Sequence, residues 1–238
     1  MPNYRLNRTH VDASPPPPPP NAALHGKFIT LAPLVYENAV FEQLHAASHG
    51  DNKRQSVWSF LPYGPFPDAA VMCAYYQGIP QNNDPMFYSV LHTDGAIAGI
   101  VSYLRITPPA YSIEIGHIWH AAARQRGRAN TEAVFLLAEN AFALGYRRVE
   151  WKCDACNIRS RLAALRLGFA FEGVFRQCTI SQGKNRDTAW FAVIDRDWPP
   201  IRDNFRRWLA AKDGAFSLAE ANRPLVAWSL SAHDSWPV

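Results

Sequence analysis

The sequence has 238 residues, of which 48% are hydrophobic and 18% are charged, so it is long and apolar enough to bury one sizeable core. The net charge of +4 is dispersed along the chain rather than gathered in one tract, and we therefore expect no nucleic-acid partner. No apolar run approaches the roughly 18 residues of a membrane span, and the first residues do not resemble a signal peptide. We expect a cytoplasmic protein without a membrane contact.

The two ends of the chain differ from its middle. Pro15–Pro20 is an unbroken proline run, so residues 1–26 are expected to be disordered or extended. This segment would be a spacer, a tail lying along the domain, or a ligand of an SH3-type domain. The region from Lys212 to Val238 is expected to be irregular. Its two tryptophans, Trp228 and Trp236, indicate packing on its own domain or on a second subunit of a homodimer.

Hydrophobic periodicity and turn residues predict strands and helices in a defined order. The expected strands are Phe28–Leu31, Met86–His92, Ile97–Ile106, Ser112–His120, Arg148–Cys153, Ala170–Ile180 and Thr188–Asp195. The expected helices are Val35–Ala47, Asp68–Gly78, Glu132–Leu144, Asn157–Leu167 and Ile201–Ala211. Val57–Phe66 is aromatic and interrupted by proline and glycine, which is typical of a loop. This order indicates an α+β fold with a mostly antiparallel sheet and one parallel crossover near the middle.

The four cysteines do not form a convincing metal site. Cys153-x-x-Cys156 resembles half of a zinc site, but no second pair of ligands follows with a suitable spacing. Cys73 and Cys178 lie far from this pair in the sequence. Reduced thiols in the core are the simpler interpretation, and we expect no metal.

The most informative stretch is Arg124–Glu132, which joins the strand that ends at His120 to the helix that follows. A strand, a short glycine loop and a helix start create a nest of backbone N–H groups that binds phosphate oxygens. Asn130 or Thr131 is expected to cap this helix. A nucleotide cofactor with a pyrophosphate would fit such a loop.

Two motifs together resemble a known family. Arg124-x-x-Gly127-x-Ala129 matches the cofactor loop of the GNAT superfamily of acetyl-CoA-dependent N-acetyltransferases. Further along, Asn157-x-x-Ser160 with Leu167-Gly168-Phe169 resembles the second cofactor segment of that superfamily. Glu172-Gly173 and the hairpin Gln182–Asp187 resemble its ribosomal-protein, Rim-type branch. The resemblance covers about residues 27–197 and leaves 198–238 as a helix and an irregular tail.

The resemblance implies a mixed, mostly antiparallel sheet with helices on both faces and a central parallel pair of strands that splay apart. The pantetheine arm of acetyl-CoA would lie between these strands as a substitute strand, and its pyrophosphate would bind amides at a helix N-terminus. The cofactor-binding residues implied in this way are Ile118, Trp119, Arg124, Gln125, Arg126, Gly127, Arg128, Ala129, Asn130, Thr131, Asn157 and Ser160. Alternatively, the three arginines would lie on the solvated surface, and Asn157 would cap its helix.

The implied reaction is the transfer of an acetyl group to a primary amine by direct attack in a ternary complex. The amine would be a protein N-terminus or a small molecule. Two alternatives stay open: a non-catalytic acyl-CoA sensor or interaction module on the same fold, and a different acyl donor such as succinyl-CoA. Positioning and an oxyanion donor, such as a backbone N–H beside Ile118 or Trp119, would supply much of the rate.

The candidate bases lie on the strand Ser112–His120. Glu114 is the first candidate, because similar enzymes often place a carboxylate on this strand. Alternation puts His120 on the same face as Glu114 and His117 on the opposite face, so His120 is the second candidate. Some Rim-type enzymes carry a carboxylate on a later strand, where this sequence has Thr179.

The candidate acid is Ser160. Many members of the superfamily have a tyrosine seven residues after the asparagine, but this sequence has Ala164 there. Ser160 matches a serine that bonds the coenzyme sulfur in the Rim-type branch, and its alternative role is to cap its helix.

An aromatic loop is expected to line the acceptor pocket, with part of it acting as a lid. Its alternative is an ordinary core. The substrate residues predicted in this way are Trp58, Phe60, Tyr63, Phe66 and Tyr88, with Pro62, Pro65 and Trp119 beside them.

Overall fold

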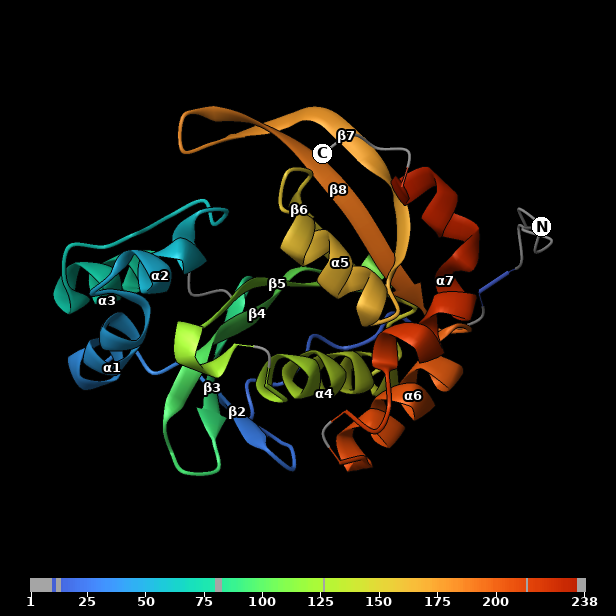
Figure 1. The fold of residues 1–238 in the computed structure, drawn as a ribbon, viewed down its shortest axis with the longest axis horizontal. Helices are drawn as coiled ribbons and strands as arrows, with labels where there is room; N and C mark the ends of the chain where they lie inside the picture. The colour runs from blue at the N-terminus through green and yellow to red at the C-terminus, as the bar shows by residue number, and fades with distance from the viewer. Residues whose placement is uncertain (1–9, 12–13, 80–82, 126, 213, 235–238) are drawn as a thin grey trace.

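A computed structural model describes residues 10–11, 14–79, 83–125, 127–212 and 214–234. Its centre is an eight-stranded sheet with the order β1-β2-β3-β4-β5-β6-β8-β7 (Figure 1). The strands are β1 (Leu24–His25), β2 (Ile29–Pro33), β3 (Met86–His92), β4 (Ile97–Thr107), β5 (Ser112–His120), β6 (Arg148–Asp154), β7 (Ala170–Ser181) and β8 (Lys184–Ile194). Neighbours in the sheet are antiparallel except for β5 and β6, which are parallel. The sequence-based fold class is therefore confirmed.

Helices cover both faces of this sheet (Figure 1). The helices are α1 (Asn38–Ser48), α2 (Asn52–Gln55), α3 (Ala69–Gln77), α4 (Ala129–Ala143), α5 (Ile158–Arg166), α6 (Trp198–Ala210) and α7 (Leu218–Asp234). Short 3₁₀ turns lie at Ser56–Trp58, Pro108–Ala110 and Ala122–Arg124. Among the helices of the described residues, none combines the length and the hydropathy that crossing a bilayer requires.

The larger core lies on the face covered by α4 and α5, which we call the α4 face. β6 shows how the sequence builds it, because Val149, Trp151 and Cys153 alternate inward while the residues between them are less buried. Phe205 anchors α6 over α4, and full burial of one such ring stabilises the fold by about 2–3 kcal/mol. The carboxylate of Glu132 in α4 accepts the backbone N–H groups of residues 27–29 at 2.7–2.9 Å, which fixes β2 against this helix.

The opposite face carries α1 and α3 over β3, β4 and β5, and we call it the α1 face. Its core is aromatic: Trp58, Tyr63, Phe66, Tyr76 and Phe87 pack against Trp119 of β5 and the two helices. Among the described residues, the helices that pack on β6 are α4 and α5 of the α4 face, so the side chains of β6 and β8 on the α1 face border a different environment.

The two ends of the chain are more ordered than the sequence indicates. Leu24–His25 pairs with β2, and Pro16 and Pro19 are buried at the three-residue repeat of an extended proline helix. The region after Lys212, expected to be irregular, contains α7, which packs on β7, α5 and α6. Its prediction was wrong because Pro224 and scattered polar residues hid the helical period. Trp236 lies outside the described residues.

Candidate active site

The central opening comes from the short pairing of β5 with β6. Their ladder contains only Ser112–Glu114 against Arg148–Glu150. Beyond it β5 continues to His120 and β6 to Asp154, and the described residues show no strand pairing between these two ends. Unpaired backbone N–H and C=O groups at a strand edge need partners, so the two edges form a site for an extended ligand. This is the splayed parallel pair that the family resemblance implies.

A β-bulge in β5 reverses the predicted faces of the two histidines. Ser102 of β4 pairs with Gly116, but Ile100 pairs with Trp119, so β5 contains one extra residue between these pairs. His117 absorbs it with a φ of 50°. The alternation after Gly116 therefore shifts by one position. The prediction that His120 shares a face with Glu114 was wrong: His120 lies on the α4 face, and His117 lies on the α1 face with Glu114.

Gly99 of β4 makes room for this bulge. It lies opposite His120 with a φ of 155°. A Cβ at this position would overlap the carbonyl oxygen of Trp119 and lie 2.9 Å from the Cα of His120. Only glycine permits this approach of the two backbones.

The N-terminus of α4 leaves its backbone amides uncapped by side chains. The helix begins at Ala129, three residues earlier than expected, and no side chain of the described residues caps it. Asn130 and Thr131 lie within the first turn, so the prediction that one of them is the cap was wrong. Their side chains have other partners, because Asn130 Oδ1 lies 3.1 Å from His120 Nε2 and Thr131 Oγ1 accepts two hydrogen bonds from Arg166 at 3.0 Å.

The loop before α4 uses its described side chains for the fold. Arg128 donates to the carbonyls of Trp208, Leu209 and Ala211, and thereby closes the C-terminus of α6. Its predicted contact with phosphate through the guanidinium is therefore not supported, although its backbone N–H lies in the loop. Gln125 Nε2 donates to the carbonyl of His120 at 3.1 Å, and Gly127 is exposed.

The side chains of the other two predicted arginines, Arg124 and Arg126, are not part of the described structure. Arg126 lies outside the described residues. Arg124 ends the short turn before the loop, and its side chain lies outside the described part.

His120 is a neutral hydrogen-bonding residue rather than an exposed base. Its side chain is buried, and burial lowers its pKa to about 4, against a hydrogen bond to Asn130 that raises it. Since Asn130 Oδ1 is an acceptor, His120 Nε2–H donates to it, and Nδ1 carries the lone pair. That Nδ1 is buried without a hydrogen-bond partner among the described residues.

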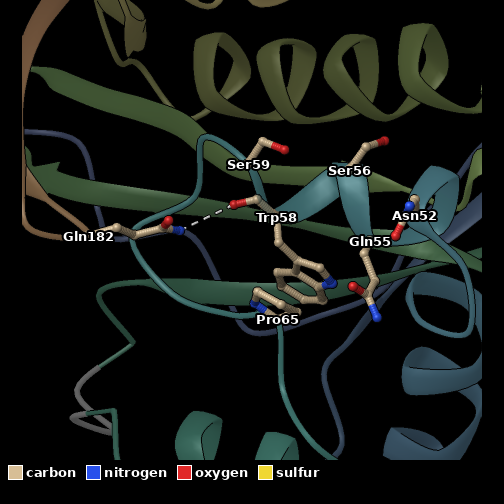
Figure 2. Close-up of a pocket in the computed structure, with 7 residues that line it drawn as sticks. All are labelled: Asn52, Gln55, Ser56, Trp58, Ser59, Pro65 and Gln182. Atoms are coloured by element: carbon tan, nitrogen blue, oxygen red, sulfur yellow. Dashed lines mark hydrogen bonds between the residues drawn. The ribbon is translucent and has the colours of Figure 1, made fainter.

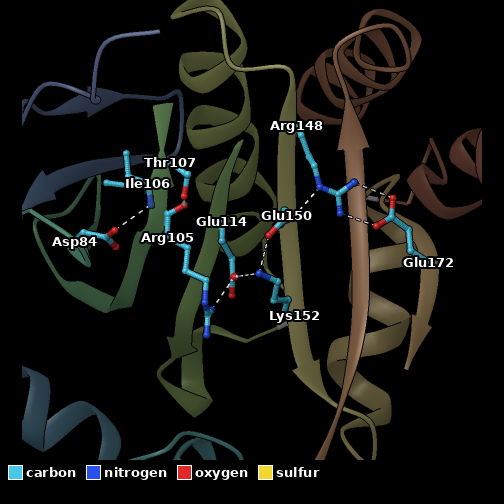
Figure 3. A network of polar contacts seen from close by, with 9 residues as sticks. All are labelled: Asp84, Arg105, Ile106, Thr107, Glu114, Arg148, Glu150, Lys152 and Glu172. Carbon is cyan, nitrogen blue, oxygen red and sulfur yellow. Dashed lines mark hydrogen bonds and ion pairs between the residues drawn. The ribbon is translucent and has the colours of Figure 1, made fainter. Parts of the chain in front are cut away.

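Glu114 belongs to a network of ion pairs on the α1 face (Figure 3). Its Oε2 lies 2.8 Å from Lys152 Nζ and 2.8 Å from Arg105 NH1. Lys152 also pairs with Glu150 at 2.6 Å, and Arg148 joins Glu150 to Glu172. Both partners Glu114 and Lys152 have almost fully buried side chains. A proton could reach Oε2 only after one of these pairs opens, so the sequence-based candidate is engaged more tightly than a free base.

Ser160 lies beside β6 at the start of α5. Its Oγ accepts a hydrogen bond from Trp151 Nε1 at 3.0 Å, and its backbone N–H donates to Asn157 Oδ1 at 3.1 Å. Asn157 is thus the cap that the sequence predicts. Burial raises the pKa of Cys153 to about 11, and a hydrogen bond with Ser160 opposes this effect. The serine hydroxyl therefore sits where the unpaired end of β6 borders the opening.

The aromatic residues divide between the two faces. Trp58, Tyr63 and Phe66 are buried in the aromatic core of the α1 face, while Phe60 is exposed. Tyr88 is fully buried on the α4 face, where it packs on Tyr103 and its hydroxyl lies 3.1 Å from Met86 Sδ. The prediction that Tyr88 lies beside the other substrate residues is therefore wrong. Side chains alternate along β3, so Phe87 rather than Tyr88 points to the α1 face.

His117 is the residue of the opening that sequence reasoning missed. Tyr63 Oη lies 2.9 Å from His117 Nδ1, and Tyr76 donates to Tyr63 at 3.3 Å. Burial, with the nearby charges of Arg105 and Arg186, lowers the pKa of His117 to about 4, so the ring is neutral at pH 7. The Gly116-His117 pair was the available signal, since a glycine in a strand often marks a bulge.

The tip of the β7–β8 hairpin reaches the aromatic loop. Gln182 Nε2 donates to the carbonyl of Leu61 at 2.9 Å and lies 3.4 Å from that of Trp58 (Figure 2). A pocket of about 330 Å³ lies at this junction, lined by Asn52, Gln55, Ser56, Trp58, Ser59, Pro65 and Gln182. The contact joins the tip of the hairpin to the aromatic core.

The cysteines are free thiols, but only two of them are in the core. Cys73 and Cys153 are buried, whereas Cys156 and Cys178 are exposed. The prediction of core thiols was wrong for Cys156, which lies in the turn after β6, and for Cys178, which lies in the exposed part of β7.

Comparison with known proteins places this geometry in one family. Residues 30–170 match the model of the acetyltransferase (GNAT) domain. The fold is similar to a GCN5-related N-acetyltransferase from Brucella melitensis, with 36% identity, a TM-score of 0.83, and coverage of 89% of this chain and 98% of that one. It is also similar to a probable acetyltransferase of the GNAT family from Chromobacterium violaceum, with 35% identity, a TM-score of 0.74, and coverage of 83% and 98%.

A more distant likeness concerns the fold alone. The microcin C7 self-immunity acetyltransferase MccE, solved in complex with acetyl-CoA and AMP, is 24% identical with a TM-score of 0.59, over 71% of this chain and 93% of that one. No curated protein matches the sequence.

Proposed function

The chain belongs to the acetyltransferase (GNAT) domain family and is an N-acetyltransferase, and we propose that it transfers an acetyl group from acetyl-CoA to a primary amine. The acceptor would be a protein N-terminus or a small molecule, and the amine would attack directly in a ternary complex. The observation that carries this proposal is the opening between β5 and β6, with an uncapped helix N-terminus at its α4 face.

The residues present fit coenzyme A. The first turn of α4 has no side-chain cap among the described residues, and the short loop with Gly127 precedes it. Backbone amides and the positive end of a helix dipole favour a pyrophosphate there. The candidate residues are Gln125, Gly127, Arg128, Ala129, Asn130 and Thr131 through their backbone, with Arg124 and Arg126 left as a prediction. Ile118, Trp119, Asn157 and Ser160 border the opening and would hold the pantetheine arm.

Acetyl-CoA supplies an activated acyl group when it is bound. The chain then has to hold a neutral amine close to that group and to stabilise negative charge on oxygen. A backbone N–H beside the bulge at Ile118 or Trp119 would be the oxyanion donor. Ser160 would donate its hydroxyl proton toward sulfur, since its Oγ already accepts a hydrogen bond from Trp151. Glu114 and His120 remain the candidate bases.

The Rim-type branch and the cytoplasm remain finer proposals. The sequence motifs at Glu172-Gly173 and Gln182–Asp187 support the branch. Free thiols at all four cysteines are compatible with a reducing compartment. A non-catalytic sensor is the alternative function.

A thiol-release assay tests the proposal. The protein is mixed with acetyl-CoA and a panel of amines and peptides, and free coenzyme A is followed by its thiol. Turnover above the uncatalysed rate is expected, whereas saturable coenzyme binding without turnover would indicate a sensor. Gly127→Val should raise the KM for acetyl-CoA about tenfold, because a branched side chain would hold the backbone away from the phosphates. Gly183→Val, in the exposed turn between β7 and β8, is the control, and an equal effect in both variants would contradict the site.

A further inference from the structure

Arg186 of β8 and Arg202 of α6 are the half-buried arginines of the described residues whose Nε is buried without a hydrogen-bond partner. Arg202 Nε lies 3.5 Å from Asp203 Oδ1, but Arg186 has no such carboxylate among the described residues. By contrast, Lys152 pairs with two carboxylates, Arg148 pairs with two, and Arg128 and Arg166 have oxygen partners. Leaving a charged donor atom buried without an acceptor costs free energy. The position therefore favours a ligand that supplies one.

The neighbouring acid does not neutralise Arg186. Asp187 Oδ1 accepts the backbone N–H of Gln177 at 2.7 Å and the side-chain N–H of Asn185 at 3.0 Å. The hydrogen bond from the backbone of Gln177, followed by the bond from Asn185, lowers the pKa of Asp187. Its carboxylate thus stabilises the wide bulge of β7, and it points away from Arg186 by the alternation of β8.

Arg186 lies on the α1 face, beside the opening. The pairs Trp190 with Lys152 and Thr188 with Asp154 fix the register of β8 on β6, so Arg186, Thr188 and Trp190 share the face of Lys152. The charge of Arg186 acts on both walls. After burial and Arg105, it helps to lower the pKa of His117 on β5, and it counters the burial that raises the pKa of Cys153 on β6.

A second donor on the same face lacks a partner. Trp190 Nε1 is buried, and no described residue accepts its hydrogen. Its ring lies under Lys152 Nζ at 3.9 Å. Two unpartnered N–H donors on one strand face indicate a ligand rich in acceptor oxygen.

The ion pairs on this face do not include Arg186. In the ion pairs of Figure 3, three carboxylates, of Glu114, Glu150 and Glu172, pair with the three cations of Arg105, Arg148 and Lys152, while the fourth carboxylate drawn, Asp84, accepts the backbone N–H of Ile106. None of these ion pairs includes Arg186, so its guanidinium has no carboxylate partner among the described residues. A carboxylate provides one negative charge and two acceptor oxygens that fit the guanidinium fork.

We propose that Arg186 binds a carboxylate on the acceptor, so that the acceptor is an amine that also carries a carboxylate, with Trp190 Nε1 as a further donor. This inference rests on the proposed acetyl transfer and narrows its substrate class. It assigns the charged group to the acceptor rather than to the acyl donor, because Arg186 lies on the α1 face and the uncapped amides of α4 lie on the other.

Matched pairs of amines test the assignment. Glycine, β-alanine and L-alanine are compared with their carboxamides as acceptors for acetyl-CoA, in the wild type, Arg186→Gln and Arg186→Lys. Arg186→Gln is expected to lower kcat/KM for the carboxylates about 10- to 100-fold and to change that for the carboxamides less than about threefold, since hydrogen bonds between charged groups have this strength. Arg186→Lys should give an intermediate loss. Arg176→Gln, an exposed arginine of the same hairpin, is the control and should have no effect.

Several results would overturn the assignment. The first is an equal loss of kcat/KM in Arg186→Gln for the carboxylates and the carboxamides. The second is a preference of the wild type for phosphoethanolamine over ethanolamine without a preference for carboxylates over carboxamides. The third is a changed preference for succinyl-CoA over acetyl-CoA in Arg186→Gln with unchanged selectivity for the acceptor. If no amine is acetylated while acetyl-CoA binds, acetyl transfer fails separately. Calorimetry with N-acetylglycine and N-acetylglycinamide on the coenzyme A complex then decides. Carboxylate binding that Arg186→Gln abolishes supports the assignment, and equal or absent binding of both probes contradicts it.

Discussion

The two faces of β5 use their side chains in different ways. On the α4 face the side chains of His120, Thr131 and Arg128 bond to other parts of the protein, and the N-terminus of α4 has backbone amides that no side chain of the described residues caps. On the α1 face aromatic residues pack against the sheet, and the buried side-chain donors without a partner among the described residues include those of Trp119, Arg186 and Trp190.

This difference fits a division between a shared cofactor and a particular acceptor. Backbone amides recognise a pyrophosphate whatever the neighbouring side chains are, so a loop can bind the same coenzyme with few fixed residues. Side chains with unsatisfied donors discriminate between ligands, because a ligand that leaves them unpaired is rejected. We infer that acceptor specificity is determined on the α1 face.

Gly99→Ala should have the largest effect, because it attacks the bulge that separates the two faces. The new Cβ would overlap the Trp119 carbonyl, so β4 or β5 must move. We expect a loss of about 3 kcal/mol or more in the free energy of unfolding, measured by urea denaturation. Gly95→Ala is the matched control, since its φ is also positive but nothing lies within 4 Å, and it should cost about 1 kcal/mol. Equal losses would show that the bulge does not need a glycine.

Stability should decrease in acid because of His120. Its folded pKa of about 4 lies below the unfolded value of 6.5, so the unfolded state binds more protons between these values. The stabilisation is fully present above pH 6.5 and is lost as the pH falls toward 4, by about 3 kcal/mol in total. Urea denaturation of the wild type and of His120→Gln, at pH 7 and pH 4.5, measures it. An unchanged pH slope in the variant would mean that His120 is already charged in the folded protein.

Glu114→Gln tests the side chains of the α1 face. Turnover should fall at least tenfold with little change in the affinity for acetyl-CoA, because the network next to the acceptor loses a charge while the α4 loop is untouched. Glu172→Gln, at the more exposed end of the same network, is the control and should keep most of the turnover. A large rise in the KM for acetyl-CoA would show that Glu114 acts on the cofactor rather than on the acceptor, which would contradict the division between the two faces.

Ser160→Ala should lower both the stability of the fold and the rate of turnover. Removing Oγ leaves Trp151 Nε1 without its acceptor, which costs about 1–3 kcal/mol of folding free energy. Turnover should fall at least tenfold if the hydroxyl serves the leaving sulfur. Ser160→Cys retains a weak donor and should recover part of the rate. Unchanged turnover in Ser160→Ala would reduce the residue to a structural partner of Trp151.

Sequence reasoning identified the elements better than the directions of their side chains. The strands of the centre and the cap at Asn157 follow from local patterns, and both are confirmed. The faces on which His117 and His120 lie do not follow from local patterns, because they depend on one extra residue in β5 that only the pairing with β4 reveals. The hydrogen bonds of Arg128 could not be predicted either, because its partners at the end of α6 are distant in the sequence and no local motif encodes such a contact.

The most direct test is a crystal structure of the protein with coenzyme A. The account predicts that the diphosphate contacts the backbone amides at the start of α4 and that the pantetheine arm runs along the unpaired edge of β5 beyond Glu114. Coenzyme bound elsewhere, or β5 and β6 paired along their full length in its presence, would contradict it.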